Sequence, residues 1–161
     1  MKITYPICAS EGDKYLVMME SFNKSILPDD IANMLGDIEI VDVTLERVYG
    51  NNPTTFSTLF EISNIIAGFL LDNENIILYF YCDDLHDIAR RNHSITPQKF
   101  RSSLFSKMFD GYISYNHSIE IENTLLEIKS DRDVYIHFIS RVCHLIYVDA
   151  IKNIIMEMES K

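Results

Sequence analysis

Residues 75–109 read NIILYFYCDDLHDIARRNHSITPQKFRSSLFSKMF, and this stretch organises the predicted fold. The run 76–82 within it is continuously apolar, which is typical of a central strand covered on both faces. Three carboxylates follow that strand, and residues 88–109 then carry five basic side chains and no acid. Because opposed charges follow a strand end here, this stretch is the first place to look for a site.

The composition indicates an ordinary globular protein. The chain has 161 residues, of which 47% are hydrophobic and 24% charged, and no linker, low-complexity run or repeat divides it. We therefore predict a single domain over residues 1–161. The longest apolar run is far shorter than the about 20 residues that span a bilayer, and the first fifteen residues hold no signal-peptide core.

A cytoplasmic protein with no membrane role is therefore expected. Cys8, Cys82 and Cys143 are widely separated and lack metal-binding or redox spacing. We expect them to be reduced and mostly buried thiols.

The periodicity of apolar residues predicts six strands, three main helices and one short helix. The expected elements are strands over residues 3–10, 14–21, 38–48, 76–82, 119–128 and 134–145, a short helix over 28–35, and helices over 53–71, 97–109 and 147–159. The order is β-β-(short α)-β-α-β-α-β-β-α. Hairpins at both ends favour an α+β fold in which helices pack against a mostly antiparallel sheet.

Three local features refine these boundaries. A phase slip in the alternation near Val41 predicts a β-bulge in the third strand. Asn52, followed by Pro53, is the expected N-cap of the first long helix, and Thr96, followed by Pro97, is the expected N-cap of the next.

Asp83, Asp84 and Asp87 form the first candidate binding group. Oxygen ligands at a rigid strand end suit Mg²⁺ or Mn²⁺, so Asp83 and Asp87 are the ligands that a metal would use. Acids also follow strands simply because the chain enters a solvated turn there. No metal is our main expectation for this group.

Arg101 lies within the expected apolar stripe of the 97–109 helix, between Phe105 and Met108. An unpaired buried charge is too costly, so Arg101 must reach water or a carboxylate. We predict that Arg101 or Arg90 pairs with one of the three aspartates and fixes the helix against the strand end.

The remaining basic groups are candidates for binding an anion. Arg90 and Arg91 diverge by about 100° if they lie on a helix, so one could serve structure while the other grips a phosphate or carboxylate. His93 joins them in this second interpretation. The structural interpretation of the whole cluster is preferred.

The segment ILYFYCDDLHDIARRNHSITPQKF resembles the central block of a family of small Bacteroidetes proteins of unknown function. The matching positions are Cys82, Asp83, Asp87, Arg90 or Arg91, and Phe100 or Phe105. The resemblance implies a bacterial, cytoplasmic single domain and carries no activity that could be transferred.

The charge distribution guides the functional hypotheses. The formal charge is −10, which opposes nonspecific binding to nucleic acid or to anionic membranes. We expect a non-catalytic binding or regulatory protein, inhibitor-like or immunity-like, whose partner is a basic protein. A homo-oligomer is not excluded. The alternative is a metal-dependent phosphodiester or nucleotide-processing enzyme that uses Asp83, Asp84 and Asp87 with Mg²⁺ or Mn²⁺.

Overall fold

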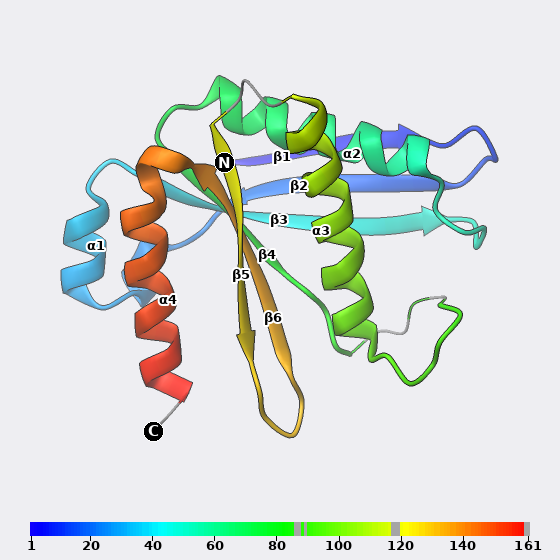
Figure 1. Cartoon of the computed structure of the whole chain (residues 1–161). Coiled ribbons are helices and arrows are strands. Elements are labelled where there is room, and N and C mark those ends of the chain that lie inside the picture. Colours follow the sequence, from blue (N-terminus) through cyan, green and yellow to red (C-terminus); the bar gives the residue numbers. More distant parts are fainter. Residues whose placement is uncertain (86–87, 89, 117–119, 160–161) are drawn as a thin grey trace.

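A computed structural model shows one six-stranded sheet with helices on both faces (Figure 1). It describes residues 1–85, 88, 90–116 and 120–159. The strands are β1 (Lys2–Cys8), β2 (Lys14–Ser21), β3 (Glu39–Tyr49), β4 (Ile76–Tyr81), β5 (Ile121–Ile128) and β6 (Val134–Arg141). Their order across the sheet is β1-β2-β3-β4-β6-β5, and every neighbouring pair is antiparallel except β3 with β4.

Four α-helices and two 3₁₀ turns complete the described part of the chain. They are η1 (Lys24–Ile26), α1 (Asp29–Leu35), α2 (Phe56–Asp72), α3 (Pro97–Tyr115), η2 (Val142–His144) and α4 (Leu145–Glu159). The predicted α+β class and the mostly antiparallel sheet are confirmed. The sixth strand ends at Arg141, earlier than predicted, because the chain turns there into η2.

Helices α2 and α3 cover one face of the sheet, whereas α1 and α4 cover the other, so the molecule has two hydrophobic cores. Strand β4 contributes to both: Ile77 packs on the α1/α4 side and Leu78 on the α2/α3 side, each without exposed surface. This arrangement explains the continuously apolar run in its sequence.

Burial on both faces also explains the phase slip in β3. Ile40 and Val41 are consecutive and both buried because they enter different cores. The bulge predicted near Val41 is therefore wrong, since Val41 pairs in register with both neighbouring strands. The register of β3 shifts instead at Val48, where Lys14 pairs with Tyr49 and Tyr15 with Arg47.

The helix caps were predicted with mixed success. Thr96 caps α3 as expected, because its hydroxyl accepts a hydrogen bond from the Lys99 N–H at 3.3 Å. The cap of α2 is Thr55, which accepts from the Thr58 N–H at 3.2 Å. Asn52 is not the cap because α2 begins later than predicted, at Phe56, and the Asn52 side chain donates to Asp13 instead.

Two further observations bear on the sequence expectations. No helix in the described part of the chain is long and apolar enough to cross a membrane. Cys82 is buried, but Cys8 and Cys143 are exposed, so the expectation of mostly buried thiols is wrong. Cys8 lies at the end of an edge strand and Cys143 in η2, where no core covers them.

Candidate functional site

The acids that follow β4 hold this end of the strand to the β5–β6 turn. Asp84 Oδ2 lies 2.7 Å from Arg132 Nη2, and the Tyr81 hydroxyl donates to Asp84 Oδ1 at 3.4 Å. Asp83 Oδ1 accepts a hydrogen bond from the Leu85 N–H at 2.8 Å. These described contacts orient the loop and the hairpin, which is what a structural role requires.

Arg101 and Arg90 reach main-chain carbonyl groups in the same loop. Arg101 Nη1 donates to the carbonyl oxygen of Asp83 at 2.7 Å, so it ties α3 to the end of β4 as the sequence suggested. Arg90 donates from Nε to the Ile95 carbonyl at 2.6 Å and from Nη1 to the Ile88 carbonyl at 2.9 Å. The predicted pairing with a carboxylate stays a prediction, because Asp87 lies outside the described residues.

The buried stripe of α3 is rotated from the one that the sequence predicted. Its buried side chains are Gln98, Ser102, Phe105, Met108, Phe109 and Tyr112, whereas Phe100, Arg101 and Leu104 are half-buried. Arg101 therefore lies beside the stripe, and its guanidinium group reaches the loop after β4.

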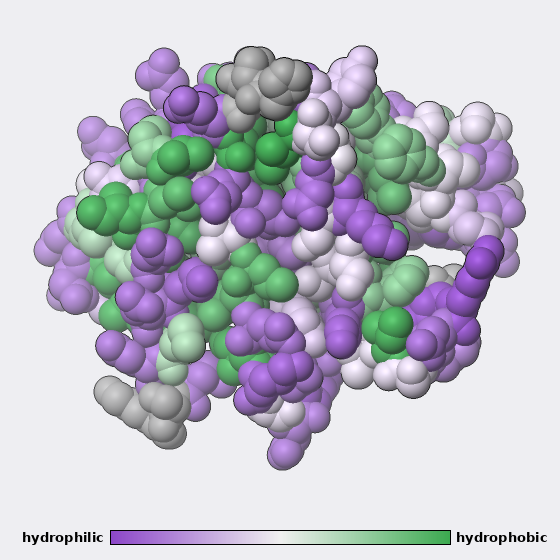
Figure 2. All heavy atoms as spheres, viewed as in Figure 1, coloured by the Kyte–Doolittle hydropathy of each residue, from purple (hydrophilic) through white to green (hydrophobic). Residues whose placement is uncertain are grey.

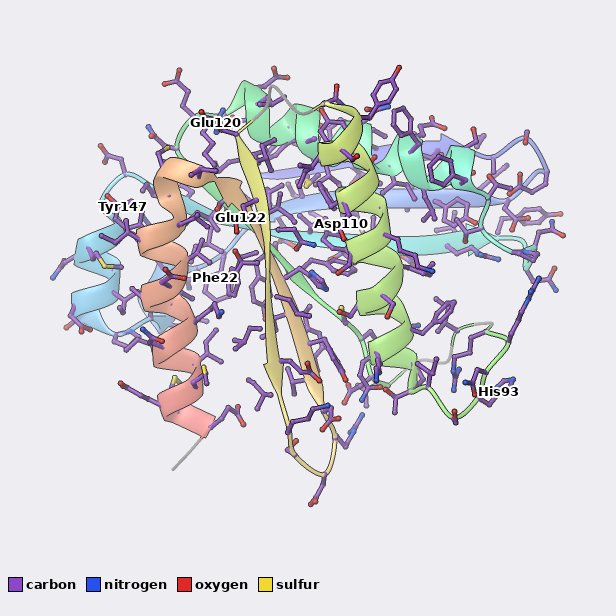
Figure 3. The ribbon with its side chains drawn as sticks, viewed as in Figure 1. Phe22, His93, Asp110, Glu120, Glu122 and Tyr147 are labelled. Atoms are coloured by element: carbon purple, nitrogen blue, oxygen red, sulfur yellow. The ribbon has the colours of Figure 1, made fainter. Side chains whose placement is uncertain are left out.

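Arg91 and His93 do not join this cluster in a compact pocket. Both are exposed, and His93 lies on the loop between β4 and α3, at the outer side of the molecule (Figure 3). Among the described residues, no three His, Cys, Asp or Glu side chains come together in a way that could hold a metal ion. Since Asp87 is outside that set, the Mg²⁺ or Mn²⁺ alternative stays a prediction.

A hydrogen-bonded chain of polar side chains crosses the core beneath β5 and β6. Ser102 Oγ lies 2.8 Å from His137 Nε2, and His137 Nδ1 lies 2.9 Å from Asn123 Oδ1. Because an amide oxygen only accepts, Nδ1 carries the hydrogen and Nε2 accepts from the Ser102 hydroxyl. The chain thereby connects α3, β6 and β5, and we call it the Ser102–His137–Asn123 chain.

His137 in this chain is neutral. It has no exposed surface, and burial lowers its pKa from 6.5 to about 4. The ring of Phe105 lies 4.9 Å from the imidazole, centroid to centroid, and stacks in turn on Phe80 at 4.1 Å. These aromatic contacts shield His137 from water, so a positive charge on its ring is disfavoured.

Cys82 adds a thiol to the Ser102–His137–Asn123 chain, but this thiol is not reactive. Burial raises the pKa of its thiol to about 12, although Arg101 and a hydrogen bond with Ser102 favour the thiolate. A thiol of that pKa is protonated at neutral pH and is a poor nucleophile. The serine–histidine arrangement resembles that of hydrolases, but Ser102 is only 4% exposed, and a hydroxyl so buried cannot meet a substrate in this conformation.

Sequence reasoning missed this chain because its members are far apart, by 35 residues from Ser102 to His137 and 14 from Asn123 to His137. One signal was present. His137 lies between apolar residues in a predicted strand. A histidine in such a strand needs hydrogen-bond partners when both faces of the sheet are covered.

A second polar cluster, equally unforeseen, surrounds Asp13 at the β1–β2 turn. Its buried carboxylate accepts from the Asn52 side chain at 2.8 Å, the Asn52 N–H at 3.0 Å and Arg47 Nη1 at 3.2 Å. Gly50 has φ +91°, and a Cβ there would lie 2.1 Å from Asp13 Oδ1, so only glycine fits. We call these residues the Asp13 cluster.

Basic side chains elsewhere in the molecule also turn toward the backbone. Arg141 donates to the carbonyl groups of Leu71, Asn73 and Glu74 at the end of α2, at 3.1, 2.8 and 3.3 Å. Lys24 donates to the carbonyl groups of Gly36 and Ile38 at 2.8 and 3.0 Å. These basic side chains therefore have hydrogen-bond partners within the molecule, whereas most acidic side chains extend into solvent.

Comparisons with protein-family models and with curated proteins found no match for this chain. The resemblance to the Bacteroidetes family therefore stays a prediction.

Proposed function

We propose that this protein is a non-catalytic binding or regulatory protein that acts through contact with a basic protein. The observation that carries the proposal is the distribution of charge: several basic side chains, among them Arg47, Arg90, Arg101 and Arg141, donate hydrogen bonds within the molecule, whereas most acidic side chains are exposed. An inhibitor-like or immunity-like role fits this pattern, because such proteins recognise a partner and do no chemistry themselves.

The outward acids are distributed over several elements. Exposed carboxylates belong to Glu20, Asp29, Asp30, Asp37, Glu39, Glu46, Glu61, Asp72, Glu74, Asp110, Glu120, Glu122, Glu127, Asp131, Asp149, Glu157 and Glu159. With a net charge of −10, this surface creates a negative potential that attracts cationic proteins and speeds their encounter. Figure 2 shows hydrophilic side chains over much of the face that β5 occupies.

The polar groups that could do chemistry support the same proposal. His137 and Ser102 are buried, and the raised pKa of Cys82 keeps its thiol protonated. Asp84 is paired with Arg132. Each of these groups has a structural task that explains its presence, so none of them requires a reaction.

The experiment is affinity capture from a lysate of the source cells at low salt, followed by binding measurements with the purified partner. We expect a basic partner whose affinity falls steeply as the salt concentration rises from ~50 mM to ~500 mM, because the Debye length shrinks to a few ångströms. Lack of any partner at low salt, or an affinity that salt leaves unchanged, would contradict the proposal. A control column carrying an unrelated acidic protein identifies proteins that bind any negative surface.

A further inference from the structure

We propose that the outer edge of β5 binds an extended, basic segment of the partner as an additional antiparallel or parallel strand. This inference rests on the proposed function and specifies where the partner binds and in what conformation. It is carried by the direction of the main-chain groups in β5, by the contrast with the other sheet edge, and by the charges around β5.

The hydrogen-bond pattern shows which main-chain groups of β5 point outward. Val142 N–H donates to the Glu120 carbonyl group at 3.0 Å, and the ladder then continues in register through Glu122 opposite Ser140. In an antiparallel pair, every second residue directs its N–H and C=O toward the neighbouring strand. The even-numbered residues of β5 therefore bond to β6, and the odd-numbered ones direct these groups away from the sheet: Ile121, Asn123, Leu125 and Glu127.

These outward groups are available for a further strand. In the part of the chain that the structure describes, no other element forms a hydrogen bond with the main chain of these four residues. Figure 1 shows β5 in front of the sheet, with α4 on one side and α3 on the other. An unpaired strand edge of this kind is a template for an added strand.

The opposite edge of the sheet has outward main-chain groups too, but they are interrupted. Ser21 N–H donates to the Met1 carbonyl group at 3.1 Å, so the even-numbered residues of β1 direct their main chain outward. One of these is Pro6, which has no N–H, and another is Lys2, whose charge opposes the approach of a cationic segment. Strand β5, with the sequence IENTLLEI, contains neither proline nor lysine.

The charges around β5 select a basic occupant. Glu120, Glu122 and Asp110 are exposed and surround the first half of the strand (Figure 3). A second copy of this chain would bring the same acids and an equal net charge of −10, so like charges oppose a β5–β5 dimer. Glu127 is paired with Lys129, which leaves the first half of β5 as the more negative part.

The alternation of side chains predicts the pattern of the bound segment. Glu122 and Leu126 lie toward α4, whereas Ile121 and Leu125 lie toward α3, since Leu126 enters one core and Ile121 the other. Leu125 is 39% exposed, and an apolar side chain directly opposite would cover it. A segment that alternates Lys or Arg with apolar residues therefore matches both faces of β5.

The test is an NMR titration of ¹⁵N-labelled protein with a capped peptide of alternating lysine and valine, with a glutamate–valine peptide as control. We expect the lysine peptide to shift the amide resonances of Ile121, Asn123, Leu125 and Glu127 and to slow their hydrogen exchange. The amides of Glu122, Thr124 and Leu126 already bond to β6 and should change little. No binding of the lysine peptide, or shifts centred on another element, would overturn the proposal.

Two variants separate the main-chain contact from the charge. Leu125→Pro removes one outward N–H and should weaken lysine-peptide binding by roughly tenfold or more, whereas Leu125→Val should keep the affinity within about twofold. Glu120→Lys with Glu122→Lys leaves the backbone intact and should transfer the preference to the glutamate peptide. Equal binding by the proline and valine variants, with β6 amides still protected, would overturn the proposal, as would an unchanged preference in the double variant.

The natural partner distinguishes failure of this inference from failure of the function. If wild-type protein and folded Leu125→Pro bind the captured basic partner equally, the β5 edge is overturned while the binding function stands. If the wild type captures no partner at all, the function itself is overturned, and the basic occupant of β5 with it.

Discussion

Strands β1 and β5 lie at opposite edges of the same sheet, yet the chain terminates the sheet differently at these two places. The β1 edge carries Pro6 and Lys2 and ends at the Asp13 cluster, where a buried carboxylate meets a guanidinium group. Among the described residues, no main-chain hydrogen bond is formed by the outward groups of the β5 edge, and the neutral Ser102–His137–Asn123 chain lies beneath this edge.

The contrast shows how two buried polar clusters in one protein can hold different charge states. Asp13 accepts from three donors that include Arg47, so its negative charge has partners. The hydrogen-bond partners of His137 among the described residues, Ser102 and Asn123, are neutral, and desolvation lowers its pKa to about 4. The cluster at the β1 edge therefore contains an ion pair, whereas the hydrogen-bonded side chains beneath the β5 edge are neutral.

The largest effect is expected at the β1 edge. Asp13→Ala removes one acceptor of Arg47 and the acceptor of two Asn52 donors, and should lower the free energy of unfolding by about 3 kcal/mol. Urea denaturation measures the loss, and Asp131→Ala, which removes an exposed acid, is the matched control with a change within about 0.5 kcal/mol. Equal effects of the two variants would show that the Asp13 cluster does not hold this edge.

The next effect concerns pH and the β5 edge. The pKa of His137 is about 4 in the folded chain and near 6.5 in the unfolded chain, so between these values the unfolded chain binds the extra proton. The contribution of His137 to the free energy of unfolding is therefore fully present above pH 6.5 and is lost as the pH falls. We expect the free energy of unfolding to decrease by about 2 kcal/mol from pH 7 to pH 4.5.

Urea denaturation of wild type and His137→Gln at both pH values tests this expectation. Glutamine has no titration in this range, so the two proteins should differ in the slope of stability against pH. The same slope in both would mean that His137 is not protected from protonation by the fold.

A smaller effect is expected where the β5–β6 turn meets the loop after β4. Arg132→Ala removes the ion pair with Asp84, and because Arg132 is largely exposed the loss should stay below about 1 kcal/mol. Amide exchange of residues 83–85 should become faster while that of β1 is unchanged. A loss of several kcal/mol would show that this contact is more than a surface ion pair; the control is Arg91→Ala.

The smallest change in stability is expected for Pro6→Val. The new N–H points outward, so stability should change by less than about 1 kcal/mol. The variant should nevertheless self-associate more than wild type in sedimentation velocity at high salt, where repulsion between chains is screened. Sedimentation identical to that of wild type would show that Pro6 is not what closes the β1 edge.

Much of the fold could be predicted because its signals are local. The apolar run of β4, the opening hairpin and the Thr96 cap each depend on residues that are neighbours in sequence. The errors have a tertiary cause. Val41 breaks the alternation because two cores meet at β3, and Asn52 does not cap α2 because the helix begins only at Phe56, while Asn52 donates to Asp13, 39 residues earlier in the chain.

The candidate site was predicted in part. Proximity in sequence correctly connected Arg101 with the end of β4, although the contact described is to the Asp83 carbonyl oxygen. It could not supply Arg132 as the partner of Asp84, because 48 residues separate them and only the β5–β6 turn brings them together.

The sequence alone determined the element types, the central position of β4 and the net negative charge, since periodicity and composition need no knowledge of contacts. The tertiary structure decided which described charges have partners and which strands lie at the edges of the sheet. It did so because hydrogen-bond partners, burial and edge position depend on segments far apart in the chain, and the pairing of β6 with both β4 and β5 is what leaves β5 outermost.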